Sequence, residues 1–168
     1  MKKIIIVLAL LVAVIPAAAF ADFQIGVVAV DPYVSLGGFI NGDNLSGSDL
    51  AYGLESRLKL WIFQGAISAF YFPSVETLYA YTDVGLALDL LFVRVGAGIG
   101  PNLAFDTQGG GSTTLGWNLK TTLDINIGNL GFGVILLTPM DYLSDIRYVL
   151  SNYADSTYLG ITVMFKLF

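Results

Sequence analysis

The chain has 168 residues, of which 55% are hydrophobic and 12% charged, and its mean hydropathy of +0.73 exceeds that of ordinary soluble domains. It contains no histidine and no cysteine, which excludes catalytic triads, cysteine nucleophiles and His/Cys zinc sites. The net charge of −5, with only 8 Lys and Arg residues, argues against a nucleic-acid partner. We therefore expect neither an enzyme nor a cofactor-binding protein.

The first 21 residues have the pattern of a secretory signal. Lys2 and Lys3 precede an apolar run at residues 4–15, and the small residues that follow give an Ala-x-Ala spacing that ends at Ala21. Such a run covers about 18 Å of helix, too little for a hydrocarbon core of roughly 30 Å. We predict a signal peptide at 1–21, cut after Ala21, and one domain at 22–168. Asp22 stands where a lipoprotein would need cysteine, so we expect no lipid anchor.

The rest of the chain alternates apolar and polar residues, which is typical of β-strands. The first strand lies within residues 23–40, where the alternation slips around Asp31 and Pro32 and predicts a bulge. Four segments of about thirteen residues each present one charge-free apolar face, a length that suits tilted membrane strands. They lie at 50–62, 77–90, 93–105 and 114–127, and three weaker segments lie at 65–72, 130–138 and 157–168.

The connections between these eight segments differ in length. Tight turns are predicted near Gln64–Gly65, Leu91–Phe92 and Gly128–Asn129. The other connections are the long or polar segments 41–49, 106–113 and 139–156 and the short segment 73–76. This asymmetry is typical of outer-membrane barrels, which have short periplasmic turns and longer external loops. The sequence thus predicts an all-β protein, an eight-stranded antiparallel up-and-down transmembrane β-barrel.

Over residues 22–168 the chain resembles the small eight-stranded outer-membrane β-barrel proteins of the OmpA/OmpX/OmpW-like class. The most specific part is residues 158–168, which resembles the final strand, ending in Phe168, that the barrel-assembly machinery of diderm bacteria recognises. The resemblance implies export to the bacterial outer membrane, contact with outer-membrane lipid and that machinery, and a monomer. Here, however, Thr162 and Lys166 share the parity of Phe168, a position that the family usually gives to apolar residues.

Charged residues gather on the face of the strands that would line the lumen. They are Glu55, Arg57, Lys59, Asp83, Asp89, Arg94, Lys120, Asp124 and Lys166, with a net charge of +1. These residues form either a selectivity lining or an ion-pair plug. We favour the plug, because eight strands enclose a lumen that side chains can just fill and buried charges need partners. Gly96, Gly98 and Gly100 are expected to leave room for Tyr79 and Tyr81.

The loops carry an acidic rim and one apolar segment. Asp43, Asp49, Glu76, Asp106, Asp141, Asp145 and Asp155 oppose only Arg147. We expect no metal site, because the loop with Asp43, Asn44, Ser46, Ser48 and Asp49 lacks EF-hand spacing. At helical spacing within 141–153 stand Tyr142, Leu143, Ile146, Val149, Leu150 and Tyr153. They predict a short amphipathic helix. This helix serves either as a lid or apolar access point to the lumen, or only as a structural element packed on the bases of the loops.

Three functions remain open at this stage. The first, which we favour, is a structural or surface-exposed outer-membrane barrel with a plugged polar lumen and no catalysis. The second is an OmpW-like passive channel for small hydrophobic molecules. The third is a soluble periplasmic lipocalin-like binder, which would turn its apolar faces inward and expose its charges. Enzymatic outer-membrane barrels that resemble this chain in size or architecture depend on a histidine that is missing here.

Overall fold

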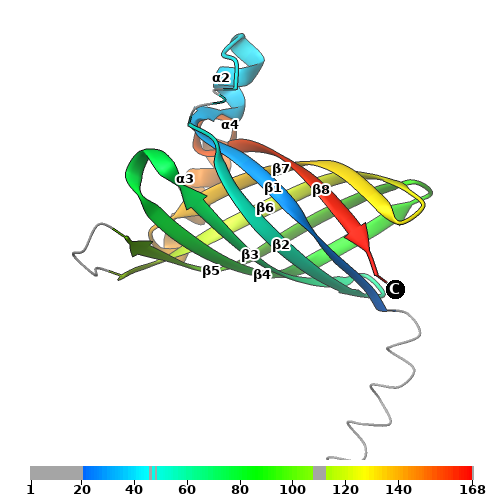
Figure 1. Ribbon diagram of the computed structural model, residues 1–168. Helices are drawn as coiled ribbons and strands as arrows, with labels where there is room; N and C mark the ends of the chain where they lie inside the picture. The colour runs from blue at the N-terminus through cyan, green and yellow to red at the C-terminus, as the bar shows by residue number, and fades with distance from the viewer. Residues whose placement is uncertain (1–20, 46, 48, 108–112, 168) are drawn as a thin grey trace, which may run out of the picture.

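The computed structural model is a closed antiparallel barrel in which each strand pairs with its sequence neighbours and β8 pairs with β1 (Figure 1). The structure describes residues 21–45, 47, 49–107 and 113–167. The strands are β1 Ala21–Ser35, β2 Ala51–Leu60, β3 Phe63–Phe72, β4 Thr77–Leu90, β5 Val93–Asp106, β6 Thr113–Ile127, β7 Leu130–Met140 and β8 Tyr158–Lys166. The predicted eight-stranded antiparallel barrel is therefore confirmed. The predicted signal peptide lies outside the described residues except for Ala21.

The alternation of the sequence separates an inner face from an outer face on every strand. On β2, Glu55 and Arg57 are buried inside the barrel, whereas Leu54 and Leu58 are exposed on its outer surface. Successive side chains of a strand point to opposite faces, so a period of two in the sequence becomes an inside and an outside in the barrel. Outward-facing hydrophobic side chains recur around the barrel, among them Val27, Ile67, Val84, Leu88, Val95, Leu123, Phe132 and Ile161.

Two-residue turns close one end of the barrel at Trp61–Ile62, Leu91–Phe92 and Gly128–Asn129. The last two were predicted, but the prediction of the first at Gln64–Gly65 is wrong, because β3 already begins at Phe63. Trp61 and Leu91 adopt positive φ angles of 58° and 59° although neither is glycine. Trp61 and Ile62 continue the apolar run of β2, and unlike Gly128–Asn129 they include no residue that favours a turn. The Trp61 side chain is exposed in this turn.

The irregularity predicted near Asp31 and Pro32 is present in β1. The register with β8 shifts between the pairs Val30↔Gly160 and Ser35↔Tyr158. The first strand, predicted within residues 23–40, begins at Ala21 and ends at Ser35, and the helix α2 (Leu36–Asn41) follows it directly. The Ser35 side chain accepts a hydrogen bond from the Gly38 backbone N–H at 3.0 Å and so caps this helix.

The loop between β7 and β8 is helical but broken. It contains a 3₁₀ helix at Leu143–Asp145, then α3 (Ile146–Ser151) and α4 (Tyr153–Ser156). The prediction of one amphipathic helix over 141–153 is therefore wrong, because the segment is divided into several short helices. The segment does lie above the barrel. A further 3₁₀ helix, Pro73–Val75, joins β3 to β4. Figure 1 shows α2, α3 and α4 at the end of the barrel opposite the tight turns.

None of the helices within the described residues has the length and hydropathy of a membrane-spanning helix.

Candidate functional site: the lumen and mouth of the barrel

The lumen contains three layers of side chains, stacked from the tight turns toward the long loops. Charged residues fill the layer nearest the turns and the middle layer, and apolar and aromatic residues fill the layer beneath the loops. The structure places all nine charged residues predicted for the lumen in the two charged layers. We call these layers the middle cluster and the turn-end cluster.

The middle cluster consists of Glu55, Arg57, Asp83, Lys120 and Asp124, contributed by β2, β4 and β6. Arg57 donates through Nε to Glu55 and through Nη1 to Asp124 Oδ2 at 2.6 Å. Lys120 Nζ lies 2.6 Å from Asp83 Oδ2 and 3.3 Å from Glu55 Oε1. The whole residue Arg57 is 0% exposed and Lys120 is 2% exposed. Each cation thus bridges two carboxylates in the interior, an arrangement that offsets the cost of removing the charges from water.

The turn-end cluster consists of Asp22, Lys59, Asp89, Arg94 and Lys166. Asp89 pairs directly with Arg94 in the β4–β5 register and accepts a hydrogen bond from Arg94 Nε at 2.6 Å. Lys59 Nζ also donates to Asp89. Arg94 pairs in addition with Asp22, whose Oδ2 lies 3.1 Å from Lys166 Nζ. The two clusters together hold five cations and five carboxylates, so their charges balance.

Asp22 is the member of the clusters that sequence reasoning missed. The sequence pattern starts the first strand at residue 23 and leaves Asp22 outside it, next to the expected cleavage point. Its parity is nevertheless that of Gln24 and Val28, which are buried inside the barrel. Extending the alternation of β1 by one residue would have put Asp22 in the lumen.

The glycines of β5 serve a different purpose from the one predicted. A Cβ added at Gly98 would lie 2.8 Å from Asp83 Oδ1, and one added at Gly96 would lie 2.7 Å from Thr122 Oγ1. At Gly100 the nearest atom is the Thr82 carbonyl oxygen, at 2.1 Å. These glycines therefore admit the middle cluster and a close backbone approach, and the expectation that they make room for Tyr79 and Tyr81 is wrong.

Tyr79 and Tyr81 belong instead to the apolar layer. The Tyr81 ring meets Phe70 edge to face with centroids 5.3 Å apart, and Tyr79 stacks on Tyr81 at 5.8 Å. Ile135 and Leu137 are both fully buried. The remaining members are Val28, Val30, Ala51, Phe72 and Tyr158. Aromatic pairs of this geometry pack tightly, so this layer closes the lumen on the loop side.

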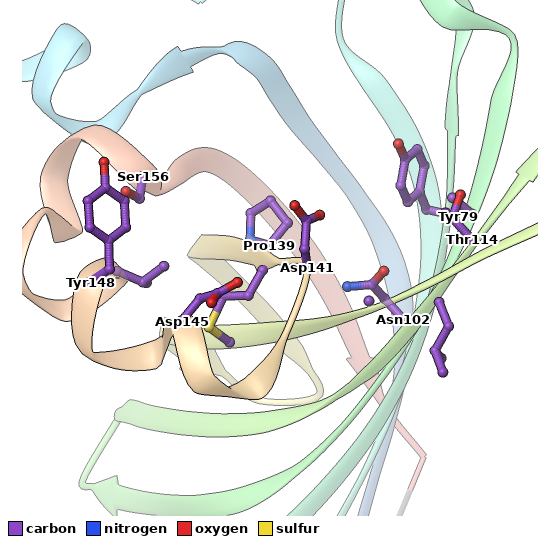
Figure 2. A pocket seen from close by; sticks show the side chains of 13 residues that line it. Tyr79, Asn102, Thr114, Pro139, Asp141, Asp145, Tyr148 and Ser156 are labelled. Carbon is purple, nitrogen blue, oxygen red and sulfur yellow. The ribbon is translucent and has the colours of Figure 1, made fainter.

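A cavity of about 490 Å³ opens above the apolar layer; we call it the mouth cavity (Figure 2). It lies between the projecting ends of β5 and β6 and the loop that follows β7. Its lining comprises Tyr79, Asn102, Ala104, Thr114, Leu115, Gly116, Pro139, Met140, Asp141, Asp145, Tyr148, Val149 and Ser156. Two members of the predicted acidic rim, Asp141 and Asp145, thus stand beside apolar and aromatic side chains.

The six residues predicted as a lid or apolar access point do not share one face. Val149 is buried and lines the mouth cavity, and it is the one member of the six that does. The Tyr153 hydroxyl donates a hydrogen bond to Thr121 Oγ1 at 3.3 Å. Ile146 is half-buried. The other three, Tyr142, Leu143 and Leu150, are exposed.

No group of three or more carboxylates within the described residues is arranged to hold a metal ion. Of the loop weighed as a cation site, Ser46 and Ser48 lie outside the described residues.

No family model matches the chain, and comparisons with curated proteins and with solved structures give no match.

Proposed function

We propose that the protein is an integral outer-membrane β-barrel with a structural or surface-exposed role and a closed lumen. The observation that carries the proposal is the inverted polarity of the barrel. Large apolar side chains cover its outside, with Val84 71% exposed, while Arg57 and Lys120 are buried within it. An apolar outer band around a polar interior is what a lipid environment requires.

The same inversion argues against the lipocalin-like alternative. A soluble barrel that binds apolar ligands would bury its hydrophobic faces and expose its charges to water. The outer surface here would be an apolar patch far larger than those of soluble monomers. The proposed location is therefore the bacterial outer membrane, reached through export and the barrel-assembly machinery, with outer-membrane lipid around a monomeric barrel.

Heat modifiability and membrane extraction test the proposed location. We expect the protein in the outer-membrane fraction, released by detergent and not by salt or carbonate. In SDS, unboiled protein should migrate differently from boiled protein, because a closed barrel resists the detergent. Recovery in a soluble periplasmic fraction without a mobility shift would refute the proposal.

The closed lumen gives a second test, in planar lipid bilayers. An ion that enters from the loops must cross the apolar layer and then separate paired charges, and both steps are costly at low dielectric. We expect small and infrequent conductance steps. The steps should become larger in Glu55→Ala, because this change removes the ion pairs of Glu55 with Arg57 and Lys120. Large steady conductance of the unmodified protein would contradict the plug.

One observation favours the OmpW-like alternative of passive uptake of small hydrophobic molecules. A cavity of about 210 Å³ lies beside the apolar layer, between the irregular part of β1 and β7, and its lining includes Pro32, Phe72, Val75 and Tyr158. Uptake of an apolar solute by vesicles that contain the protein, reduced when the segment 142–153 is deleted, would support this function.

A further inference from the structure

We propose that a groove on the outer surface of the barrel, over Gly65 of β3, holds one acyl chain of a phospholipid. The groove begins beside the tight turn at Trp61–Ile62, so the chain belongs to the leaflet on the side of the tight turns. The inference rests on the proposed membrane location and concerns neither the lumen nor the loops. We call this feature the Gly65 groove.

Among the glycines of the described strands, Gly65 alone faces outward. Its neighbours Gln64 and Ala66 are buried on the lumen side of β3. The other strand glycines have the parity of the lumen-facing side chains, and a Cβ added at any of them would lie within 2.9 Å of another atom. Crowding in the interior therefore accounts for those glycines. At Gly65 the nearest atom would be the Asp83 carbonyl oxygen, 3.9 Å away, so a larger residue would fit.

The backbone does not require glycine at this position either. The described glycines with positive φ angles are Gly42 and Gly128. Gly65 pairs with Leu58 on β2 and with Val84 on β4, and the register continues without a shift on both sides. Glycine weakens a strand, and a strand glycine outside a bulge or bend often marks the close approach of a ligand or another backbone. The missing side chain therefore indicates a contact from outside the barrel.

The missing side chain leaves a groove of about 510 Å³ over the neighbouring strands β2, β3 and β4 (Figure 1). The outward-facing residues that line it are Phe23, Ser56, Leu58, Leu60, Phe63, Ile67, Thr82 and Val84. Along β3 the lining extends from Phe63 to Ile67, which is about 13 Å at the rise of a strand. This length is comparable with the depth of one leaflet, about half of a hydrocarbon core of roughly 30 Å.

The chemistry of the groove suits a hydrocarbon chain. None of its outward-facing side chains is charged. The Thr82 hydroxyl donates a hydrogen bond to the Pro101 carbonyl oxygen at 3.0 Å, so it is satisfied within the barrel. A charged ligand would lose its water here without meeting an opposite charge. The groove is also continuous with the apolar outer band, which the proposed function places in lipid.

A second copy of the barrel fits the groove less well than an acyl chain. Ile67 and Val84 are 64% and 71% exposed at the rim, so they hold a second convex surface away from the floor at Gly65. The volume exceeds that of any one apolar side chain, and a single inserted residue would leave much of the groove without contacts. A flexible chain instead follows the floor and contacts the walls on both sides.

The test counts the phospholipids that the full chain retains in detergent. The protein is folded in dodecylmaltoside micelles with palmitoyl-oleoyl-phosphatidylethanolamine as the probe, washed with detergent, and weighed intact by native mass spectrometry. We expect one retained phospholipid per chain. Gly65→Leu, which fills the groove, should lower the retained fraction at least fivefold. Ala69→Leu adds a leucine to an exposed position of the same strand outside the groove and should change the fraction less than twofold.

A photoreactive lipid locates the retained chain on the barrel. The probe is a phosphatidylethanolamine with a diazirine in the middle of one acyl chain, at a few molecules per protein in the same micelles. Light expels nitrogen from the diazirine, and the carbene that remains inserts into a nearby C–H bond. We expect labelling of Leu58 and Val84 at least fivefold above that of Leu123, an exposed outward-facing residue of β6 that detergent covers in the micelle.

Four results would overturn the proposal. They are no retained phospholipid, a retained fraction unchanged in folded Gly65→Leu, equal labelling of Leu123 and the groove, and a complex of two chains that Gly65→Leu dissociates, which would assign the groove to a second copy. The mobility shift in SDS checks that each variant is folded, and the labelling of the unmodified protein decides if Gly65→Leu does not fold. Failure of the proposed function is distinguishable, because it appears as recovery of the protein in a soluble fraction, whereas a membrane-extracted barrel without a retained lipid refutes the groove alone.

Discussion

Replacing Arg57 by methionine should be among the most damaging single changes in the lumen. Arg57 is fully buried and holds two carboxylates, Glu55 and Asp124. Glu55 keeps Lys120 and the Ser68 hydroxyl after the replacement, but Asp124 loses its ion pair. At the 2.6 Å separation of Nη1 and Oδ2 the gross attraction is about 6 kcal/mol for an effective dielectric constant of 20. Removing one partner of a buried pair typically costs about 3–5 kcal/mol, and we expect that loss in the free energy of unfolding.

The double variant Arg57→Met, Asp124→Asn separates pairing from packing. It removes the stranded carboxylate together with the guanidinium, so we expect it to be about 2 kcal/mol more stable than Arg57→Met alone. Lys59→Met is the matched control on the same face of β2, two residues away. Its partner Asp89 has a side chain that is 42% exposed, and the cost should stay near 1 kcal/mol.

Urea titration of the barrel folded in lipid vesicles measures these differences, with fluorescence of Trp61 and Trp117 as the signal. The slope of the free energy against urea must stay constant for the comparison to hold. The reasoning fails if Arg57→Met costs less than about 1 kcal/mol, because the change then strands no charge. It also fails if the double variant loses at least the sum of the losses in Arg57→Met and Asp124→Asn, because the two residues are then not coupled.

Two further perturbations test the turn-end cluster and the glycine contacts. Asp22→Asn removes a carboxylate that two cations share and should destabilise the barrel by about 2–3 kcal/mol. Asp89→Asn should cost about 1 kcal/mol, since the Asp89 carboxylate is partly hydrated. Equal urea midpoints of the two variants would contradict this ranking. A Cβ added at Gly133 would lie 2.2 Å from Asp124 Oδ1, so Gly133→Ala should destabilise by about 1–3 kcal/mol through displacement of that carboxylate. Gly65→Ala, where the nearest atom is 3.9 Å away, is the control and should be near neutral in the same titration.

The sequence was sufficient for the strands because each carries a period-two signal that a barrel turns into two distinct surfaces. The same signal assigned Arg57 and Lys120 to the lumen, where both are buried. The prediction of the turn between β2 and β3 failed because the alternation does not stop where the strand ends. Trp61 forms this turn with an apolar side chain, so the pattern continues past the end of β2.

Partners across the lumen could not be predicted, because they depend on how the barrel closes. Arg57 and Asp124 are separated by 67 residues and lie on β2 and β6, which are not neighbours in the sheet. Alternation identifies the face on which a side chain lies but not the strand it meets across a closed lumen. The mouth cavity was hidden for a related reason. Its carboxylates come from the β7–β8 loop and Asn102 from β5, and the closed barrel brings them to one rim.

The order of the three layers opposes the passage of an ion from the mouth cavity through the lumen. A cation that enters at Asp141 next meets Tyr79 and, below it, Phe70 and Leu137. These side chains cannot replace the water molecules that the ion must lose to pass. Beneath them the five luminal cations already occupy the five carboxylates, so a further cation must displace one of them. The apolar layer and the closed ion pairs therefore both oppose the passage of an ion through the lumen.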